Sequence, residues 1–217
     1  MLYLVATPIG DPQEISLRAL TVFKMAEVVI CESTKETAQL LKFHGITGKK
    51  FEILDEHSKA DDLKYLLELC RQSNVALASD CGTPGFCDPG AELVKLCNQN
   101  DIAVKSVLGA SSLMGLISLS GQRLDQFLFR GFLPAENQAR EEALKELRKQ
   151  KQAIIIMDTP YRLQKTLNDI ERHFAERELV LALNLSNENE QILRGKISQI
   201  RKMSVPEKAE FMLLILK

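Results

Sequence analysis

The sequence predicts an α/β protein of two domains. In the first half, short apolar segments alternate with segments of helical period, and strands joined by helical crossovers form parallel sheets. In the second half, apolar segments follow one another across short turns rich in Asn and Glu, which predicts hairpins and a mixed sheet. A Gly-Ala-Ser-Ser turn at residues 109–112 precedes a helix that links the halves. We therefore expect an N-terminal α/β domain of residues 1–112 and a C-terminal α/β domain of residues 113–217.

The first half shows five strand signals and clear helix boundaries. Ser16 is placed to cap a helix that buries Leu17 and Phe23, and Gly45 is placed to end the helix that begins at Thr34. The expected strands are Leu2–Val5, Val28–Ile30, Phe51–Leu54, Val75–Ala78 and Ile102–Ser106.

The second half contains five further strand signals and one strongly charged helix. That helix is expected over Arg140–Lys151, where glutamates are interspersed with the basic residues. We interpret it as a solvated face, in preference to an RNA contact. The expected strands are Phe127–Phe132, Ala153–Met157, Leu179–Leu185, Gln191–Gly195 and Phe211–Leu216.

Composition limits the function classes. The formal net charge of −1 argues against a dedicated nucleic-acid binder, so any RNA contact must use a local patch. The cysteines show neither a C-x-x-C pair nor a zinc-like spacing, so no metal is expected. Their odd number and the short N-terminal apolar segment predict a cytoplasmic protein with no membrane association. The five cysteines are Cys31, Cys70, Cys81, Cys87 and Cys97.

The segment Ser79–Gly90 is the most informative stretch of the chain. It packs three glycines and two prolines into twelve residues directly after a buried strand. Open α/β sheets bind ligands at the carboxyl ends of their strands, and glycine allows the backbone to approach a ligand closely. A purely structural turn is the alternative. No G-x-G-x-x-G sequence follows the first strand, which argues against a dinucleotide enzyme.

Seven motifs in order along the chain resemble those of the 16S rRNA ribose 2′-O-methyltransferases of the RsmI type, in the tetrapyrrole-methylase superfamily. Together they run across nearly the whole sequence. They are Leu4–Gly10, Ile15–Leu20, Cys31–Lys35, Ser79–Gly90, Phe129–Pro134, Pro160–Leu163 and Lys208–Phe211.

The resemblance implies a parallel N-terminal sheet, a mixed C-terminal sheet, and S-adenosylmethionine (SAM) bound in a cleft between the two domains. It also implies a homodimer that acts on rRNA or the small ribosomal subunit. The cofactor-binding positions carried over from the family are Pro8, Asp80, Gly82, Leu108, Ser111, Ser112, Met157, Leu185, Glu210, Phe211 and Met212. Ordinary core packing is the alternative for Met157 and Leu185.

Methyl transfer to a ribose hydroxyl needs alignment of donor and acceptor, and a base or a positioned cation helps. Glu32 is the first candidate for the base because it follows a strand at the same sheet edge as Asp80. Asp80 and Lys35 complete the catalytic candidates, while Asp88, Arg162 and His57 are further polar residues expected near the ligand. For each, a capping, salt-bridge or surface role is the alternative.

The sequence departs from the family pattern mostly on the acceptor side. Lys35 replaces an arginine, Tyr161 replaces a histidine and Leu108 replaces a proline. The sequence ends at Lys217, directly after the last expected strand, where many relatives continue into a helical tail, so we interpret it as a short form. Two alternatives to an rRNA methyltransferase therefore stay open, a methyltransferase of a small molecule such as a tetrapyrrole and a non-catalytic SAM-binding paralogue.

Overall fold

The computed structural model describes residues 1–86 and 88–217. Cys87, part of the glycine- and proline-rich loop, lies outside them. The chain divides into two units, Met1–Ser111 (unit 1) and Ser112–Lys217 (unit 2).

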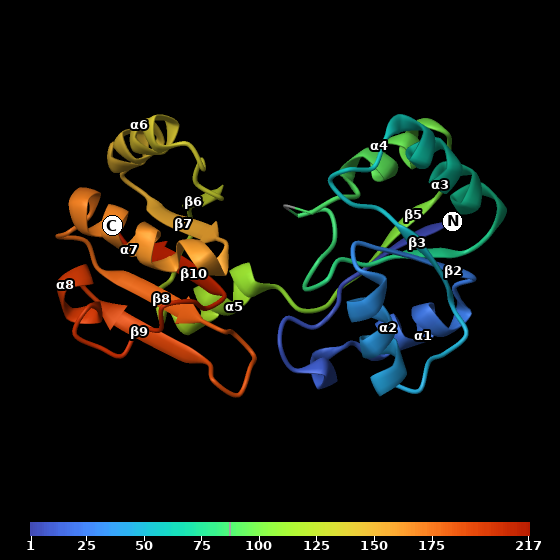
Figure 1. Ribbon diagram of the computed structural model, residues 1–217, viewed down its shortest axis with the longest axis horizontal. Helices are drawn as coiled ribbons and strands as arrows, with labels where there is room; N and C mark the ends of the chain where they lie inside the picture. Colours follow the sequence, from blue (N-terminus) through green and yellow to red (C-terminus); the bar gives the residue numbers. More distant parts are fainter. Residues whose placement is uncertain (87) are drawn as a thin grey trace. The chain divides into compact units, whose positions relative to one another are not determined.

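Unit 1 is a three-layer α/β/α unit built on a parallel sheet (Figure 1). Its strands pair in the order β3-β2-β4-β1-β5, and every pairing is parallel. Apolar residues of α1 and α2 pack on one face and those of α3 and α4 on the other. The strands are β1 (Leu2–Val5), β2 (Val28–Cys31), β3 (Lys50–Ile53), β4 (Val75–Leu77) and β5 (Val104–Val107). The helices are η1 (Pro12–Glu14), α1 (Leu17–Met25), α2 (Thr34–Phe43), α3 (Ala60–Gln72) and α4 (Ala91–Gln99).

Local sequence signals explain two of the helix boundaries in unit 1. The Ser16 hydroxyl accepts a hydrogen bond from the Ala19 N–H, which confirms Ser16 as a cap. Gly45 has φ +70° and the Ile46 N–H bonds back to the Leu41 carbonyl, which confirms the expected end of α2. One expectation is wrong, because Leu17 at the first position of α1 is 84% exposed.

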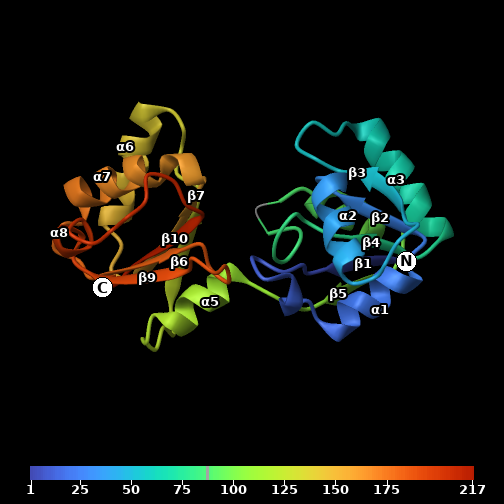
Figure 2. The ribbon, with the colours of Figure 1, turned by 60° about the horizontal axis from the view of Figure 1, so that its bottom comes forward.

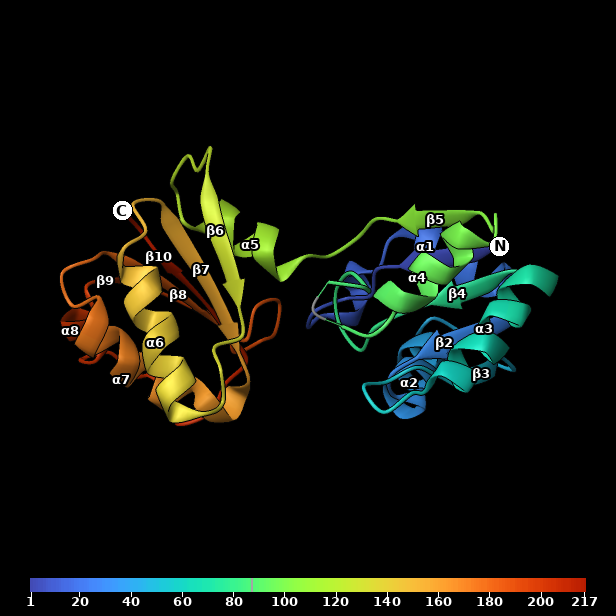
Figure 3. The same cartoon turned by 90° about the horizontal axis from the view of Figure 1, so that it is seen from above.

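Unit 2 holds a mixed five-stranded sheet, with α6, α7 and α8 on one face and α5 on the other (Figures 2 and 3). The strand order is β6-β7-β10-β8-β9. Only β6 and β7 are parallel neighbours, and the other pairings are antiparallel. The strands are β6 (Phe127–Gly131), β7 (Ala153–Asp158), β8 (Leu179–Leu183), β9 (Gln191–Gly195) and β10 (Phe211–Ile215). The helices are α5 (Ser112–Leu119), α6 (Asn137–Arg148), η2 (Pro160–Arg162), α7 (Leu163–His173) and α8 (Ile197–Ile200).

The core of unit 2 explains why β7 and β10 are so apolar. Both are central strands, and all five residues of β10 are buried. Helices α6 and α7 bury Leu144, Leu147 and Leu167 against this sheet. A strand covered on both faces needs apolar residues at consecutive positions, which is why no alternation is visible in its sequence.

Candidate functional site

The loop after β4 is tied to the loop after β1 at one edge of the unit 1 sheet. Thr7 and Gly82 form an antiparallel bridge, in which the Thr7 N–H donates to the Gly82 carbonyl at 2.8 Å and the Gly82 N–H donates back at 3.1 Å. The buried Thr7 hydroxyl also donates to the Ser79 carbonyl at 3.1 Å. Gly82 has φ +79°, a conformation that favours glycine. The structure therefore brings Gly82 beside the segment that contains Pro8.

Two of the three catalytic candidates meet at this edge. The Asp80 N–H donates to Glu32 Oε1 at 3.4 Å, and Asp80 Oδ1 accepts from the Ser33 N–H at 3.1 Å. These bonds join the end of β2 to the end of β4, two neighbouring parallel strands. The juxtaposition of Glu32 and Asp80 follows from the parallel pairing, as expected.

A third carboxylate adds to this group, which we call the unit 1 carboxylate cluster: Glu32, Asp80 and Asp88. Burial raises the pKa of Asp88 to about 6, opposed by a hydrogen bond from Ser79. Burial raises the pKa of Glu32, and the charge of Asp88 raises it further. Burial also raises the pKa of Asp80. Among the described residues, none of the three has a Lys or Arg partner within 4 Å, so the cluster carries uncompensated negative charge.

The segment after β5 lies on the same side of unit 1. The Thr83 hydroxyl donates to the Ala110 carbonyl at 3.3 Å. A Cβ at Gly109 would stand 3.0 Å from the Ala6 Cβ, so the backbone of this turn passes close to the end of β1. Leu108 is largely exposed, Ser111 is half-buried, and Ser112 begins α5.

Unit 2 gathers the remaining cofactor candidates at one end of its sheet. Met212 pairs with Met157 on one side and with Ala182 on the other. The Asn184 N–H donates to the Glu210 carbonyl at 2.8 Å, and the Glu210 N–H donates to Asn184 Oδ1 at 3.1 Å.

Phe211 pairs with Asp158, and Leu185 is buried just beyond β8. Five of the predicted positions in unit 2 therefore converge, namely Met157, Leu185, Glu210, Phe211 and Met212.

Three predicted polar residues do not join the unit 1 carboxylate cluster. The Lys35 side chain is 85% exposed, and its ion pair is with the neighbouring Glu36 at 3.9 Å. His57 is also exposed and faces Glu56. Arg162 lies in unit 2, where its guanidinium binds Asp158 Oδ1 and the Leu133 carbonyl, each at 3.3 Å.

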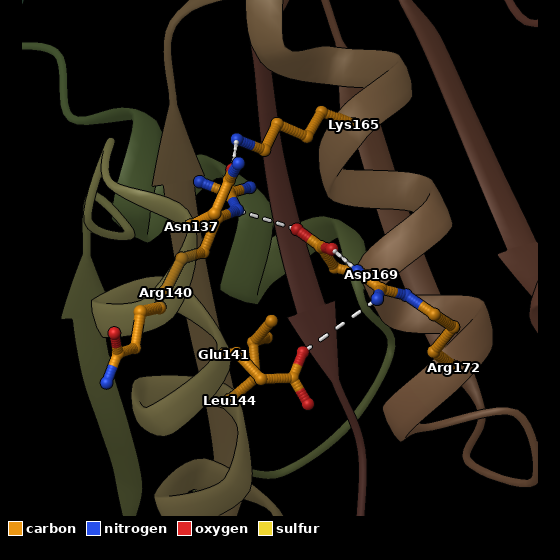
Figure 4. A pocket seen from close by; sticks show the side chains of 8 residues that line it. Asn137, Arg140, Glu141, Leu144, Lys165, Asp169 and Arg172 are labelled. Carbon is orange, nitrogen blue, oxygen red and sulfur yellow. Dashed lines mark hydrogen bonds and ion pairs between the residues drawn. The ribbon is translucent and has the colours of Figure 1, made fainter.

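Sequence reasoning missed a buried ionic network around Arg140, and Figure 4 shows the part of it formed by Arg140, Asp169 and Arg172. The Arg140 side chain, 2% exposed, donates from Nε to Asp169 Oδ2 at 2.6 Å and from Nη1 to Asp158 Oδ2 at 3.1 Å. Its Nη2 donates to the Thr166 hydroxyl at 2.8 Å. Arg172 holds the other Asp169 oxygen at the surface.

Three members of this network, Arg140, Asp169 and Arg172, line a cavity of about 560 Å³ between α6 and α7. The expectation of a solvated helix is therefore wrong at its first residue. Arg140, Leu144 and Leu147 recur at helical spacing on one face, which is the sequence signal that marks Arg140 as inward-facing.

Among residues 1–86 and 88–217, no group of three or more His, Cys, Asp or Glu side chains is arranged to hold a metal ion. Within the same residues, no helix has the length and apolarity that crossing a membrane would take.

Comparison with known proteins identifies the family of this chain. The sequence matches the tetrapyrrole (corrin/porphyrin) methylases over residues 1–201. The chain belongs to the tetrapyrrole methylase family. It is thus a SAM-dependent methyltransferase, as the motifs predicted.

Its relatives include proteins named ribosomal RNA small subunit methyltransferase I. The one from Synechocystis sp. is 36% identical over 198 residues, covering 91% of this chain and 71% of the relative. The one from Pasteurella multocida is 37% identical over 204 residues, covering 93% of this chain and 72% of the relative.

Solved structures confirm the fold. A diphthine synthase superposes with a TM-score of 0.77 at 15% identity, covering 100% of this methylase and 90% of that chain. A uroporphyrin-III C-methyltransferase from Thermus thermophilus, complexed with S-adenosylhomocysteine, superposes with a TM-score of 0.66 at 17% identity, covering 100% and 97%.

Proposed function

We propose that this methylase transfers a methyl group from SAM to the rRNA of the small ribosomal subunit, at a ribose 2′-hydroxyl. The observation that supports the acceptor is the identity of about 36% to relatives named for small-subunit rRNA methylation, over nine tenths of the chain. The small-molecule alternative is less favoured, because the tetrapyrrole and diphthine enzymes resemble this chain at only 15–19% identity.

The described residues fit SAM chemically. SAM supplies an electrophilic methyl group on a positively charged sulfonium. Among the described residues, no Lys or Arg neutralises the negative charge of the unit 1 carboxylate cluster, so we assign the methionine and sulfonium end of SAM to Asp80 and Gly82. Pro8, Leu108, Ser111 and Ser112 complete this set.

In unit 2 the strand ends offer backbone amides and carbonyls, which suit a neutral adenine. We assign the adenine to Met157, Leu185, Glu210, Phe211 and Met212. Four of these side chains are apolar, and Glu210 would contribute through its backbone groups.

Glu32 is the proposed general base. It would accept the proton of the attacking hydroxyl as the oxygen bonds to the methyl carbon, while the sulfur–methyl bond of SAM breaks and S-adenosylhomocysteine leaves. Burial raises the pKa of Glu32, which makes its carboxylate a stronger proton acceptor than an exposed glutamate. Asp80, whose N–H donates to Glu32 Oε1, orients that carboxylate. Lys35 is exposed and lies two residues beyond Ser33, whose N–H donates to Asp80, so we assign it to phosphate attraction and not to proton transfer.

The test is a transfer assay with methyl-labelled SAM against small ribosomal subunits, rRNA extracted from them, and uroporphyrinogen. We expect label in rRNA, at a linkage that resists alkaline hydrolysis because the 2′-oxygen is blocked. Glu32→Gln is expected to lower kcat about 10²- to 10⁴-fold. Glu36→Gln, a change of an exposed glutamate on the neighbouring helix, should leave kcat within about two-fold. Label in uroporphyrinogen and none in rRNA would contradict the proposal.

A cytoplasmic location and a homodimer are further parts of the proposal. An rRNA substrate implies the first, and the buried Cys31, Cys70 and Cys97 are free thiols, which is consistent with a reducing compartment. The homodimer rests on likeness to the family alone, and light scattering in solution tests it.

A further inference from the structure

An exposed aromatic ring stands at the strand end of unit 2 that carries the proposed adenine-binding residues. Tyr161 lies in η2, three residues beyond Asp158 at the end of β7. Lys208 lies three residues before Phe211, which opens β10. Since Phe211 pairs with Asp158, the antiparallel register brings Tyr161 and Lys208 to the same edge of the sheet.

Tyr161 and Lys208 form a contact pair on the surface of unit 2. Tyr161 is 80% exposed, well above the intermediate burial that is usual for tyrosine. The Lys208 ammonium lies 3.7 Å from the centre of its ring, a cation–π contact. Tyr65 in unit 1 shows the contrast: it is 47% exposed, its hydroxyl donates to Glu52, and Lys50 lies 5.7 Å from its ring centre.

Hydrogen bonds to the buried side chain of Asp158 hold the turn that carries Tyr161. Asp158 Oδ1 accepts from the Thr159 N–H at 2.9 Å and from Arg162, and its other oxygen accepts from buried Arg140. Arg162 also binds the Leu133 carbonyl, which ties the turn to the loop after β6. The chain therefore holds an exposed ring and two cations, Arg162 and Lys208, on a rigid support, which is how a binding surface is preorganised.

The charge distribution favours a polyanion on this unit. Unit 2 contains 17 Lys and Arg against 14 Asp and Glu, whereas unit 1 contains 11 against 15. The overall charge of −1 hides this asymmetry. Net charge therefore favours RNA contacts on unit 2 over unit 1.

We propose that Tyr161 stacks on a base of the acceptor RNA, while Lys208 and Arg162 contact the adjoining phosphates. Stacking on an exposed ring is how proteins hold unpaired nucleotides, and flanking cations track the backbone. The proposal rests on the proposed function, whose acceptor it places on a named surface.

The test compares Tyr161→Ala, Tyr161→Phe and the control Tyr65→Ala, using small ribosomal subunits and their extracted rRNA. Tyr161→Ala is expected to raise KM for the RNA about 5- to 100-fold, the loss of one stacked base, with kcat within about three-fold. Tyr161→Phe keeps the ring and should stay within about two-fold of wild type. Tyr65→Ala should leave KM unchanged. The SAM dissociation constant, measured by calorimetry, should not move in any variant.

Lys208→Gln adds an electrostatic readout. It should lower the salt dependence of RNA binding by about one phosphate contact. An unchanged salt dependence would contradict the phosphate contact assigned to Lys208.

The outcomes separate the two proposals. If wild type methylates rRNA but Tyr161→Ala leaves KM unchanged, the stacking proposal is wrong and the proposed function stands. If Tyr161→Ala weakens SAM binding as much as RNA binding, Tyr161 belongs to the donor site and the stacking proposal is again wrong. If wild type labels no RNA at all, the proposed function fails and the stacking proposal with it.

Discussion

The two units treat their carboxylates in opposite ways. In unit 2, Asp158 and Asp169 are almost fully buried, yet each is held by arginine: Arg140 bridges both, and Arg162 and Arg172 take the remaining oxygens. In unit 1, the carboxylate cluster of Glu32, Asp80 and Asp88 is less buried, and none of its members has a basic partner among the described residues. The buried carboxylates of unit 2 are therefore paired with arginines that stabilise the fold. The carboxylates at the proposed donor site in unit 1 have no such partner among the described residues.

This difference has a physical basis. Burying an ion costs several kcal/mol unless a partner and hydrogen bonds compensate it. Unit 2 meets that requirement within the chain. In unit 1, partial burial raises the pKa values of Glu32, Asp80 and Asp88, and such perturbed carboxyls cluster at functional sites. A cationic ligand such as the sulfonium of SAM would complete the compensation.

The largest expected effect comes from breaking the unit 2 network. Arg140→Ala leaves Asp158 and Asp169 buried without their shared cation, and the loss of one partner of a buried ion pair costs about 3–5 kcal/mol. Urea unfolding measures the free energy of unfolding, and hydrogen exchange should place the loss in α6 and α7. Arg148→Ala, on the exposed face of the same helix, should cost less than about 0.5 kcal/mol. Equal effects of the two changes would show that the network does not stabilise the fold.

A smaller effect of opposite sign is expected from Asp88→Asn in unit 1. The folded pKa of Asp88, about 6, lies above its unfolded value of 3.8. Folding therefore favours the protonated form, and the favourable contribution present below pH 3.8 is lost as the pH rises through 6. The full shift corresponds to about 3 kcal/mol, which solvent screening at this half-buried site reduces to about 1 kcal/mol.

Asp88→Asn stays neutral at every pH. It should therefore raise the free energy of unfolding by about 1 kcal/mol at about pH 7 and by almost nothing near pH 4, as measured by urea unfolding across that range. Asp125→Asn, a change at an exposed aspartate, is the control and should show no such trend. A constant difference at all pH values would mean that the charge of Asp88 is not what destabilises the fold.

Much of this architecture could be predicted from the sequence, because buried strands and capped helices leave local signals. The bounds of α2 follow from Ser33, Thr34 and Gly45. By contrast, β5 begins at Val104 and not at Ile102, since the Ile102 N–H bonds to the Cys97 carbonyl and closes the end of α4. Local apolar character cannot distinguish a strand residue from one that closes a helix.

The candidate site was predictable where it depends on sheet order alone. Glu32 and Asp80 meet because β2 and β4 are parallel neighbours. The pairing of Arg140 with Asp158 and Asp169 was not predictable, since those residues lie 18 and 29 positions apart and meet only through helix packing. The exposure of Tyr161 and its contact with Lys208 likewise depend on the register of β10.

The measurement that tests the central claim most directly is calorimetry of SAM and S-adenosylhomocysteine with wild type and Asp80→Asn. The two ligands differ by a methyl group and a positive charge on sulfur. An ion pair about 5 Å apart in a wet site contributes about 1 kcal/mol, or roughly five-fold in affinity. The substituted amide keeps an oxygen that can accept from the Ser33 N–H, so the loop is preserved. We predict that Asp80→Asn lowers the affinity for SAM about three- to five-fold more than that for S-adenosylhomocysteine. Equal losses for both ligands, or no loss for either, would contradict the claim that the uncompensated carboxylates of unit 1 bind the charged methyl donor.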